Sequence, residues 1–564
     1  MDRPLVPFLS RRLLMTGVLA VVTILPANQV ARGQNDPLTP ALNAIPANVQ
    51  AVLLIPDLSK LNQEVSMLSG ALDLAMLSDA VGQFKSITGM RNGFRDDGPM
   101  LVFTEDLKGA LSTAGQLMML IPVADYEILA ESLGVPKDTD GPSPVTLATG
   151  HTGFIKKAEG FVVFGSSEQK VGAYKPANAA GKRLAGFGDL GKRSLQGNPI
   201  FLLIDPAGKG PFLEMLSNLL SNVADLFPLL HLADSHIERA HENLDALIKE
   251  ADSVLVGMDL GVDGVSLTMT AHYKAGSKSA QQTKAGGGAA LQLALLPDRP
   301  LVAAFSANTA AMPPLLSGLM GLGSNHSEVL PLIQKSQRNS AALYVPPPNS
   351  QPIHGVMVGE VVDPKAVVGA FKTYIATRNT DPQPGEPAGW ETTYLANAVT
   401  LEGLSLDQYQ VRAPFDAQMA MGGMAMFLSD FGGYVVGRDK MVLATFGPDI
   451  ELTRAALGFS KRGGGLGSSG HIFEQRRRAL GGDPVMESYL DLSGLYKVPV
   501  VQMFPHPVQP PDNLPPMAHY ADVVDGEVGM QLFLPAPVIG FLKDLVLDSL
   551  QSDEAPQERV GIAE

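Results

Sequence analysis

The residues best suited to chemistry lie in one stretch, HLADSHIERAHENLDALIK at positions 231–249. Written as a helix, it places imidazoles and carboxylates on one face, at offsets of 0, 3, 7, 10 and 14 residues. These residues are His231, Asp234, Glu238, His241 and Asp245. A stripe of this composition could ligate a divalent metal ion and serve a metal-assisted hydrolase.

The same stretch has a second interpretation. An apolar stripe runs along the opposite side of the helix and consists of Ile237, Ala240, Leu244, Leu247 and Ile248. The polar face would then be the solvent side of an amphipathic helix. Neither HExxH nor another compact ligand spacing is present, so the pattern favours the amphipathic helix. In the metal interpretation the ligands are His231, Asp234, Glu238 and His241.

A second candidate is the methionine-rich segment MAMGGMAM at 419–426. In a hairpin its four methionines would project from one face and suit Cu(I), whereas in a helix they scatter around the axis. The flanking residues are rich in Ala and Met and lack β-branched side chains, which favours a helix. No copper site is therefore predicted.

Other motifs do not indicate an enzyme. GLGSSG at 465–470 matches GxGxxG, but a helix predicted over 452–458 precedes it where a strand is required, so we interpret it as a flexible loop. GxSxG and paired SxxK and KTG motifs are absent. The basic run Arg476–Arg478 is interpreted as a solvated helix face. Together with a formal net charge of −15, this argues against a nucleic-acid partner.

A repeated phrase points to the elements that carry these residues. Asp-Leu-Ser-x-Leu ends an apolar run at both 57–61 and 491–495. A strand, then Asp or Asn, then a helical pattern recurs along the chain, twice with Pro directly after Asp. An aspartate there accepts hydrogen bonds from helix-start amides, and Pro fits the first turn. The predicted helix caps are Asp57, Asp125, Asp205, Asn308, Asp363, Asp449 and Asp491.

The strand and helix patterns occur in the same order twice, which predicts an internal duplication. The predicted fold class is α+β, in two similar halves, each a mostly antiparallel or mixed sheet with helices packed on it. We place the first half at 44–274 and the second at 293–548. A Gly-rich polar linker at 275–292 separates them, and 549–564 is a polar tail.

The amino terminus has the layout of an export signal at residues 1–33. A basic start precedes an apolar run of 13 residues, Leu13–Leu25, which is too short to span a bilayer as a helix. Arg11 and Arg12 resemble a twin-arginine signal, although general export signals also carry such pairs. The chain has 0 cysteines, which excludes disulfides and thiolate metal sites. We predict a periplasmic or secreted protein with no membrane span in its mature chain.

The segment IPANVQAVLLIPDLSKL at 45–61 resembles the start of uncharacterised exported bacterial proteins that carry an "IPAD…VVxVxDLxxL" phrase. That resemblance implies export and an α+β repeat, and it implies no activity. The function predicted from the sequence is a non-enzymatic exported protein that binds an unidentified ligand or protein partner, or has a structural role, without a cofactor. The alternative is the metal-assisted hydrolase that uses the helix face at 231–245.

Overall fold

The computed structural model divides the described part of the chain into two compact units. The first takes its residues from Met1–Gly287 and Ala521–Phe533, and the second from Gly288–Met312, Leu322–Tyr520 and Leu534–Glu564. The described residues are 38–74, 78–112, 116–136, 141–215, 248–283, 293–309, 338–348, 350, 354–377, 391–412, 430–462, 464–468, 470–476, 479, 484–499, 501–503 and 509–554.

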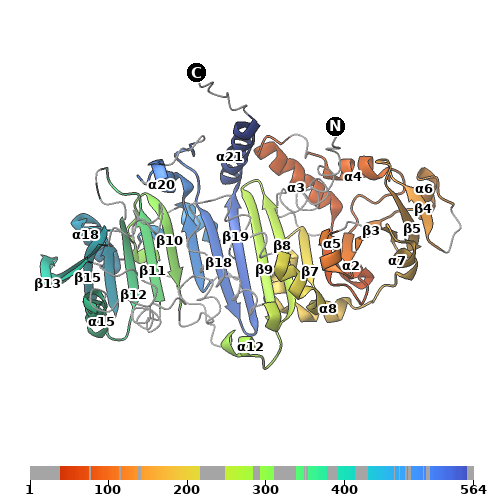
Figure 1. Ribbon diagram of the computed structural model, residues 1–564. Coiled ribbons are helices and arrows are strands. Elements are labelled where there is room, and N and C mark those ends of the chain that lie inside the picture. Colours follow the sequence, from red (N-terminus) through yellow and green to blue (C-terminus); the bar gives the residue numbers. More distant parts are fainter. Residues whose placement is uncertain are drawn as a thin grey trace, which may run out of the picture. The chain divides into compact units, whose positions relative to one another are not determined.

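The first unit is built on an antiparallel sheet in which β7, β8 and β9 lie side by side (Figure 1). Its strands, in spatial order, are β4 (Ser143–Thr146), β5 (Thr152–Ala158), β6 (Phe161–Gly165), β3 (Met118–Pro122), β2 (Met100–Thr104), β1 (Ala51–Ile55), β7 (Ile200–Ile204), β8 (Ala251–Gly261), β9 (Gly264–Tyr273) and β19 (Glu527–Pro535). All pairings from β4 to β9 are antiparallel.

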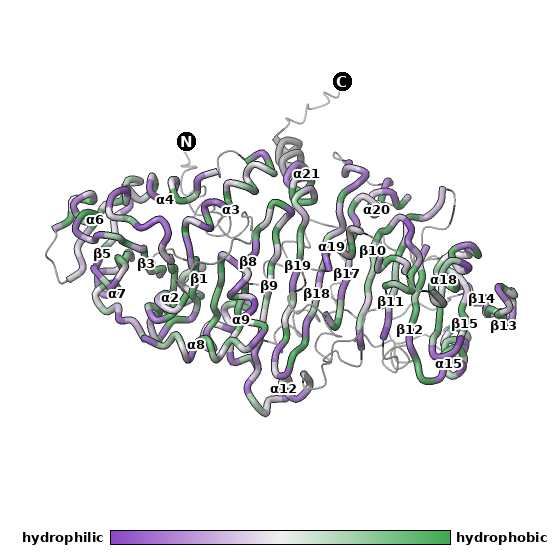
Figure 2. The backbone as a smooth tube through the Cα atoms, turned by 180° about the vertical axis from the view of Figure 1, so that it is seen from behind, coloured by the Kyte–Doolittle hydropathy of each residue, from purple (hydrophilic) through white to green (hydrophobic). Residues whose placement is uncertain are grey.

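Strand β1 is largely buried on both faces. Val52 and Leu54 on one face and Ala51 and Ile55 on the other are buried, and Leu53 is half-buried. Hydrophobic residues likewise recur along β8 and β9 (Figure 2). The helices that contribute to this core are α2 (Leu38–Ala44), α7 (Glu168–Ala173), α8 (Ala180–Gly186) and α9 (Gly188–Gly197). The unit's other helices are α3 (Leu58–Ala71), α4 (Ala80–Thr88), α5 (Leu107–Ser112), α6 (Tyr126–Ser132) and α12 (Lys278–Thr283).

Helix α9 begins against a carboxylate from far along the chain. The backbone amides of Asp189 and Leu190 donate to the two carboxylate oxygens of Glu527, at 2.7 and 2.6 Å. Gly188 has a φ of 67°, and a Cβ there would lie 2.3 Å from that carboxylate, so only glycine fits. A buried negative charge thereby satisfies amides that the helix leaves unpaired. Strand β19 thus completes the first unit.

The second unit has a sheet of the same kind. Its strands, in spatial order, are β13 (Glu391–Leu401), β14 (Leu404–Arg412), β15 (Asp430–Arg438), β16 (Met441–Phe446), β12 (His354–Glu360), β11 (Arg338–Tyr344), β10 (Leu301–Ala307) and β17 (Met486–Leu490). Each of these pairings is antiparallel. Strand β18 (Met517–Val524) is divided between the two units.

Small or polar residues allow helices to pack closely on the second sheet. Helix α15 (Pro364–Thr377) packs on β13, β15 and β16. A Cβ on Gly437 would lie 2.9 Å from the Cβ of Pro364, so glycine permits the close approach. Helix α18 (Ile450–Arg462) contacts β16 through the buried hydroxyls of Thr445 and Thr453, 3.2 Å apart. The remaining helices are α19 (Gly470–Arg476), α20 (Leu492–Tyr496) and α21 (Ala536–Glu554).

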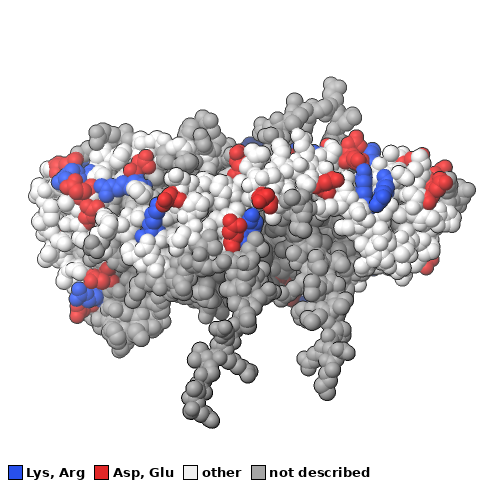
Figure 3. Space-filling model, turned by 90° about the horizontal axis from the view of Figure 1, so that it is seen from above, with Lys and Arg blue, Asp and Glu red and all other residues white. Residues whose placement is uncertain are grey.

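The prediction of an α+β fold with mostly antiparallel sheets is confirmed. Part of the predicted linker is helical, because α12 lies within it. The last residue of α12, Thr283, accepts a hydrogen bond at its Oγ1 from the Gly526 amide at 3.0 Å. Among the described residues, no helix is both long enough and apolar enough to cross a bilayer. On the face in Figure 3, the described acidic and basic side chains lie in small mixed groups.

Candidate functional site

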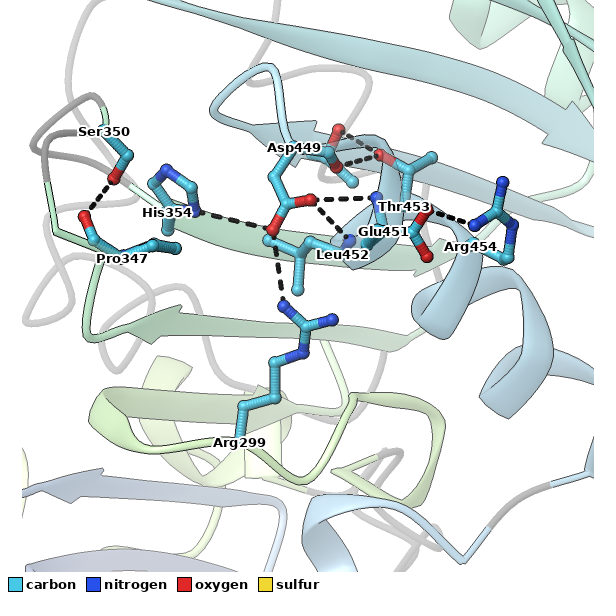
Figure 4. A network of polar contacts seen from close by, with 10 residues as sticks. Arg299, Pro347, Ser350, His354, Asp449, Glu451, Leu452, Thr453 and Arg454 are labelled. Atoms are coloured by element: carbon cyan, nitrogen blue, oxygen red, sulfur yellow. Dashed lines mark hydrogen bonds and ion pairs between the residues drawn. The ribbon is translucent and has the colours of Figure 1, made fainter.

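Figure 4 shows a polar network around the start of α18 in the second unit. Asp449 Oδ1 accepts hydrogen bonds from the amides of Glu451 and Leu452, at 2.8 and 3.1 Å. Its other oxygen faces Arg299 Nη1 at 3.4 Å and His354 Nδ1 at 3.9 Å. A helix cap, a guanidinium and an imidazole therefore share one carboxylate.

The imidazole of this network is neutral near pH 7. His354 is 4% exposed, and burial lowers its pKa; the charge of Asp449 acts in the opposite direction, and that of Arg299 lowers it further. A separation of 3.9 Å from Asp449 is too long for a hydrogen bond. The Ser350 hydroxyl donates to the Pro347 carbonyl at 2.7 Å rather than to the imidazole.

A hollow of about 410 Å³ lies beside the network. It is lined by Arg299, Glu402, Glu451, Arg454, Ala455, Gly458 and Phe459. Arg454 forms an ion pair with Glu451, and Arg299 is held by Asp449, so both guanidinium groups already face carboxylates. The charged residues that line the hollow have both signs and do not select a ligand of one sign.

The sequence-predicted metal site lies outside the described residues. This applies to His231, Asp234, Glu238 and His241, and also to the methionine segment at 419–426 and to the export signal. Within the described ranges, no group of three or more His, Asp or Glu is arranged to hold a metal ion. The metal interpretation therefore stays a prediction.

The predicted helix caps can be compared with the structure one by one. Asp57 and Asp125 each accept two amide hydrogen bonds, at 2.9–3.0 Å and 2.9–3.1 Å respectively. Asp363 and Asp491 each accept one, from Ala366 at 3.0 Å and from Gly494 at 3.1 Å. With Asp449, five of the predicted caps are confirmed. Asn308 directly follows β10, and residues 310–337 are outside the described part.

The prediction for Asp205 was wrong. Its side chain makes no capping bond to the short 3₁₀ turn Pro206–Gly208. Instead both oxygens accept from Arg183 Nη1, at 3.3 and 3.4 Å. Burial raises the pKa of Asp205, and the guanidinium acts against that change. The charge of Arg183 attracts the carboxylate more strongly than the turn amides do.

Two further interpretations need correction. The interpretation of Arg476–Arg478 as a solvated helix face does not hold for Arg476, whose half-buried guanidinium binds the buried carboxylate of Glu487, while Arg477 and Arg478 lie outside the described residues. The GxGxxG segment follows α18, as predicted, yet it is not a free loop. The amide of Gly465 donates to Ala294 at 3.0 Å, and that of Leu466 donates to Leu296 at 2.8 Å. A Cβ on Gly465 would lie 1.9 Å from the Leu296 carbonyl oxygen, so this glycine allows backbones to touch.

We predict that Asp57→Ala lowers the free energy of unfolding by about 0.5–2 kcal/mol, because two amides at the start of α3 lose their acceptor. Asp57→Asn should cost only a few tenths of a kcal/mol, since asparagine caps nearly as well. Urea unfolding of the parent and both variants tests this. Equal losses from the two substitutions would show that the charge, rather than the capping bond, stabilises the helix.

Sequence reasoning named Asp449 only as a cap and missed its partners. Arg299 and His354 lie 150 and 95 positions before it, so no local spacing relates the three residues. The strand–Asp–helix pattern was the single available signal. The network depends on antiparallel pairing of β12 with β16, which brings His354 close to the start of α18.

Comparisons with known proteins add no function. No family model matches this chain, and no curated protein matches it. A solved structure titled "Structure of crystal form III of TP0453" aligns with a TM-score of 0.23 and 10% identity, over 45% of this chain and 99% of that chain. At that TM-score the likeness carries no argument. The class that the geometry defines is an α+β protein built on antiparallel sheets.

Proposed function

We propose that the protein is a non-enzymatic exported protein, a duplicated α+β scaffold with a binding or structural role in the cell envelope or outside the cell. The observation that carries this proposal is the order of strand pairing. In the first unit β1 lies between β2 and β7, and in the second β10 lies between β11 and β17. The spatial order then continues in the same way, as β2, β3, β6 and β5 in the first sheet and as β11, β12, β16 and β15 in the second.

The repeated aspartates support an architectural role for the repeated phrase. Asp57 follows β1 and caps α3, and Asp491 follows β17 and caps α20. A catalytic pair of carboxylates would be drawn together in one pocket, whereas each of these is engaged by its own helix. The repeated Asp-Leu-Ser-x-Leu sequence therefore forms the junction between a strand and the helix that follows it. In the strand pairing described above β1 corresponds to β10 and β17 to β7, so Asp57 and Asp491 follow strands at different positions in the two sheets, and the phrase itself is not evidence for the duplication.

Export is the second part of the proposal. The apolar run at Leu13–Leu25 and the arginine pair before it support it. The formal net charge of −15 fits a partner that is neither a nucleic acid nor an anionic membrane surface. The alternative function, a metal-assisted hydrolase, would use His231, Asp234, Glu238 and His241.

Expression of the full chain in a bacterial host, followed by intact mass and metal analysis of the exported fraction, tests both functions. We expect a mature chain that begins near Gln34 and carries no stoichiometric metal. Retention of the Leu13–Leu25 segment would contradict cleavage of an export signal. Stoichiometric zinc or manganese that is lost in His241→Ala, but kept in the control His236→Ala, would favour the hydrolase.

A further inference from the structure

Strand β13 is an edge of the second unit's sheet. It has 11 residues, and in the described part of the chain it pairs only with β14. Most of its side chains are exposed or half-buried, and Leu395 is 58% exposed. The outer side of such a strand presents a row of backbone N–H and C=O groups that can pair with another chain. It therefore has to be explained what keeps an edge strand of this length and apolarity from pairing with another chain.

The edge is interrupted in its middle. Leu395 is paired with Gln408 and Val399 with Leu406, so residues 396–398 of β13 face Asp407 alone. Asn397, at the centre, has a φ of 54°, in the left-handed region. A bulge of this kind bends the strand and removes the regular spacing that a partner strand requires.

One carboxylate fastens the bulge. Asp407 Oδ1 accepts from the Asn397 amide at 2.8 Å, and its Oδ2 accepts from the Tyr394 hydroxyl at 2.5 Å. The Ser405 hydroxyl donates to Asn397 Oδ1 at 2.7 Å. Hydrogen bonds to an ionised carboxylate are about twice as strong as neutral ones, so Asp407 can hold Asn397 in its unfavourable backbone conformation.

The strand is also tied to the helix beside it. The Thr392 hydroxyl donates to the Ile375 carbonyl of α15 at 2.7 Å. Lys372 Nζ, also from α15, lies 5.8 Å from the ring centroid of Tyr394. These contacts fix the part of β13 that precedes the bulge. Side chains of β14 and contacts with α15 therefore both stabilise the interruption.

We infer that the bulge at residues 396–398, fastened by Asp407, is a conformational device that prevents β13 from pairing with β13 of a second copy. Without it, an unbroken strand would present the exposed Leu395 and a regular row of edge groups. Two such edges are self-complementary in antiparallel orientation, since each N–H row meets a C=O row. The inference is independent of the proposed function.

The direct test removes the bulge. Deletion of Asn397 and Ala398 leaves Ala396 opposite Asp407, which restores one-to-one pairing with β14. Size-exclusion chromatography with light scattering, over a hundredfold range of concentration, should show that this variant self-associates at least tenfold more tightly than the parent. Leu395→Lys in the same background should reverse that change, because a charged edge residue opposes strand addition.

Substitutions provide the second line of the test. Asp407→Ala should also increase self-association, and Tyr394→Phe should do so less. Asp407→Asn should lie between the parent and Asp407→Ala, because it keeps an acceptor for the Asn397 amide but loses the charge and the acceptor for the Tyr394 hydroxyl. Circular dichroism identifies any variant that does not fold, and Tyr394→Phe, which loses one hydroxyl, is the mildest change. Parent-like behaviour of the folded deletion variant, or association that persists with Leu395→Lys, would overturn the inference.

Discussion

Replacing Glu487 by alanine is expected to lower the stability of the second unit by about 3–5 kcal/mol. Glu487 is 0% exposed, and its Oε2 accepts from Arg476 Nε at 2.7 Å and from the Tyr489 hydroxyl at 2.8 Å. Burial and the carboxylate charge both raise the pKa of Tyr489, so its proton stays in place as a donor. Alanine would leave the half-buried guanidinium of Arg476 and the buried hydroxyl of Tyr489 without their shared acceptor.

Thermal and urea unfolding of three variants would separate the contribution of the Arg476–Glu487 ion pair from the cost of leaving a charge buried without its partner. The double substitution Arg476→Met with Glu487→Leu should recover much of the loss, because it leaves no unpaired charge. The matched control is Asp430→Ala, which removes an exposed partner of Arg412 and should cost less than about 1 kcal/mol. Similar losses from Glu487→Ala and Asp430→Ala would contradict the assignment of Glu487 as a buried anchor.

The stability of the first unit is expected to fall by about 3 kcal/mol as pH rises from 4.5 to 7, because of Glu64. Its side chain is 1% exposed, and neither carboxylate oxygen has a hydrogen-bond partner. Burial raises its pKa to about 7; Lys60, 3.4 Å away, acts against this, while Asp259 and Asp57 add to it. In the unfolded chain this carboxyl ionises near 4.5, so stability is full below that pH and decreases up to about 7.

Glu64→Gln should remove this dependence, since the amide has nearly the same shape and no charge. Unfolding free energies of the parent and the variant at pH 5 and pH 8 give the measurement, and the variant should gain most at pH 8. Glu159→Gln, at an exposed turn residue, is the control and should follow the parent. An unchanged difference between pH 5 and pH 8 in Glu64→Gln would show that other groups cause the dependence.

The sequence predicted the strand-to-helix junctions well, because each junction depends on neighbouring residues of the chain. A strand that ends in aspartate before a helical pattern needs only the next three residues to become a cap, as at Asp57 and Asp125. Where a distant charge competes, the local pattern fails, as Arg183 shows at Asp205. The α+β class followed from the same periodic patterns.

Buried charges could not be predicted from the sequence. Arg476 stands in a run of three arginines, which by itself is typical of a solvated surface. Its partner Glu487 is 11 positions away on β17, and whether that strand buries the carboxylate depends on the packing of the unit. The same holds for the Arg299, His354 and Asp449 network, whose members are distant in sequence.

The place of Ala521–Phe533 in the first unit governs when that unit can finish folding. Strand β9 pairs with β19, and α9 receives its carboxylate from Glu527, 338 positions after Asp189. A growing chain makes these parts only after nearly all of the second unit has been synthesised. Until then, the edge of β9 and the first amides of α9 lack their partners, and contacts so far apart in sequence form slowly. A chain that stops before residue 521 would therefore expose an open sheet edge, which marks it as incomplete to proteases and chaperones.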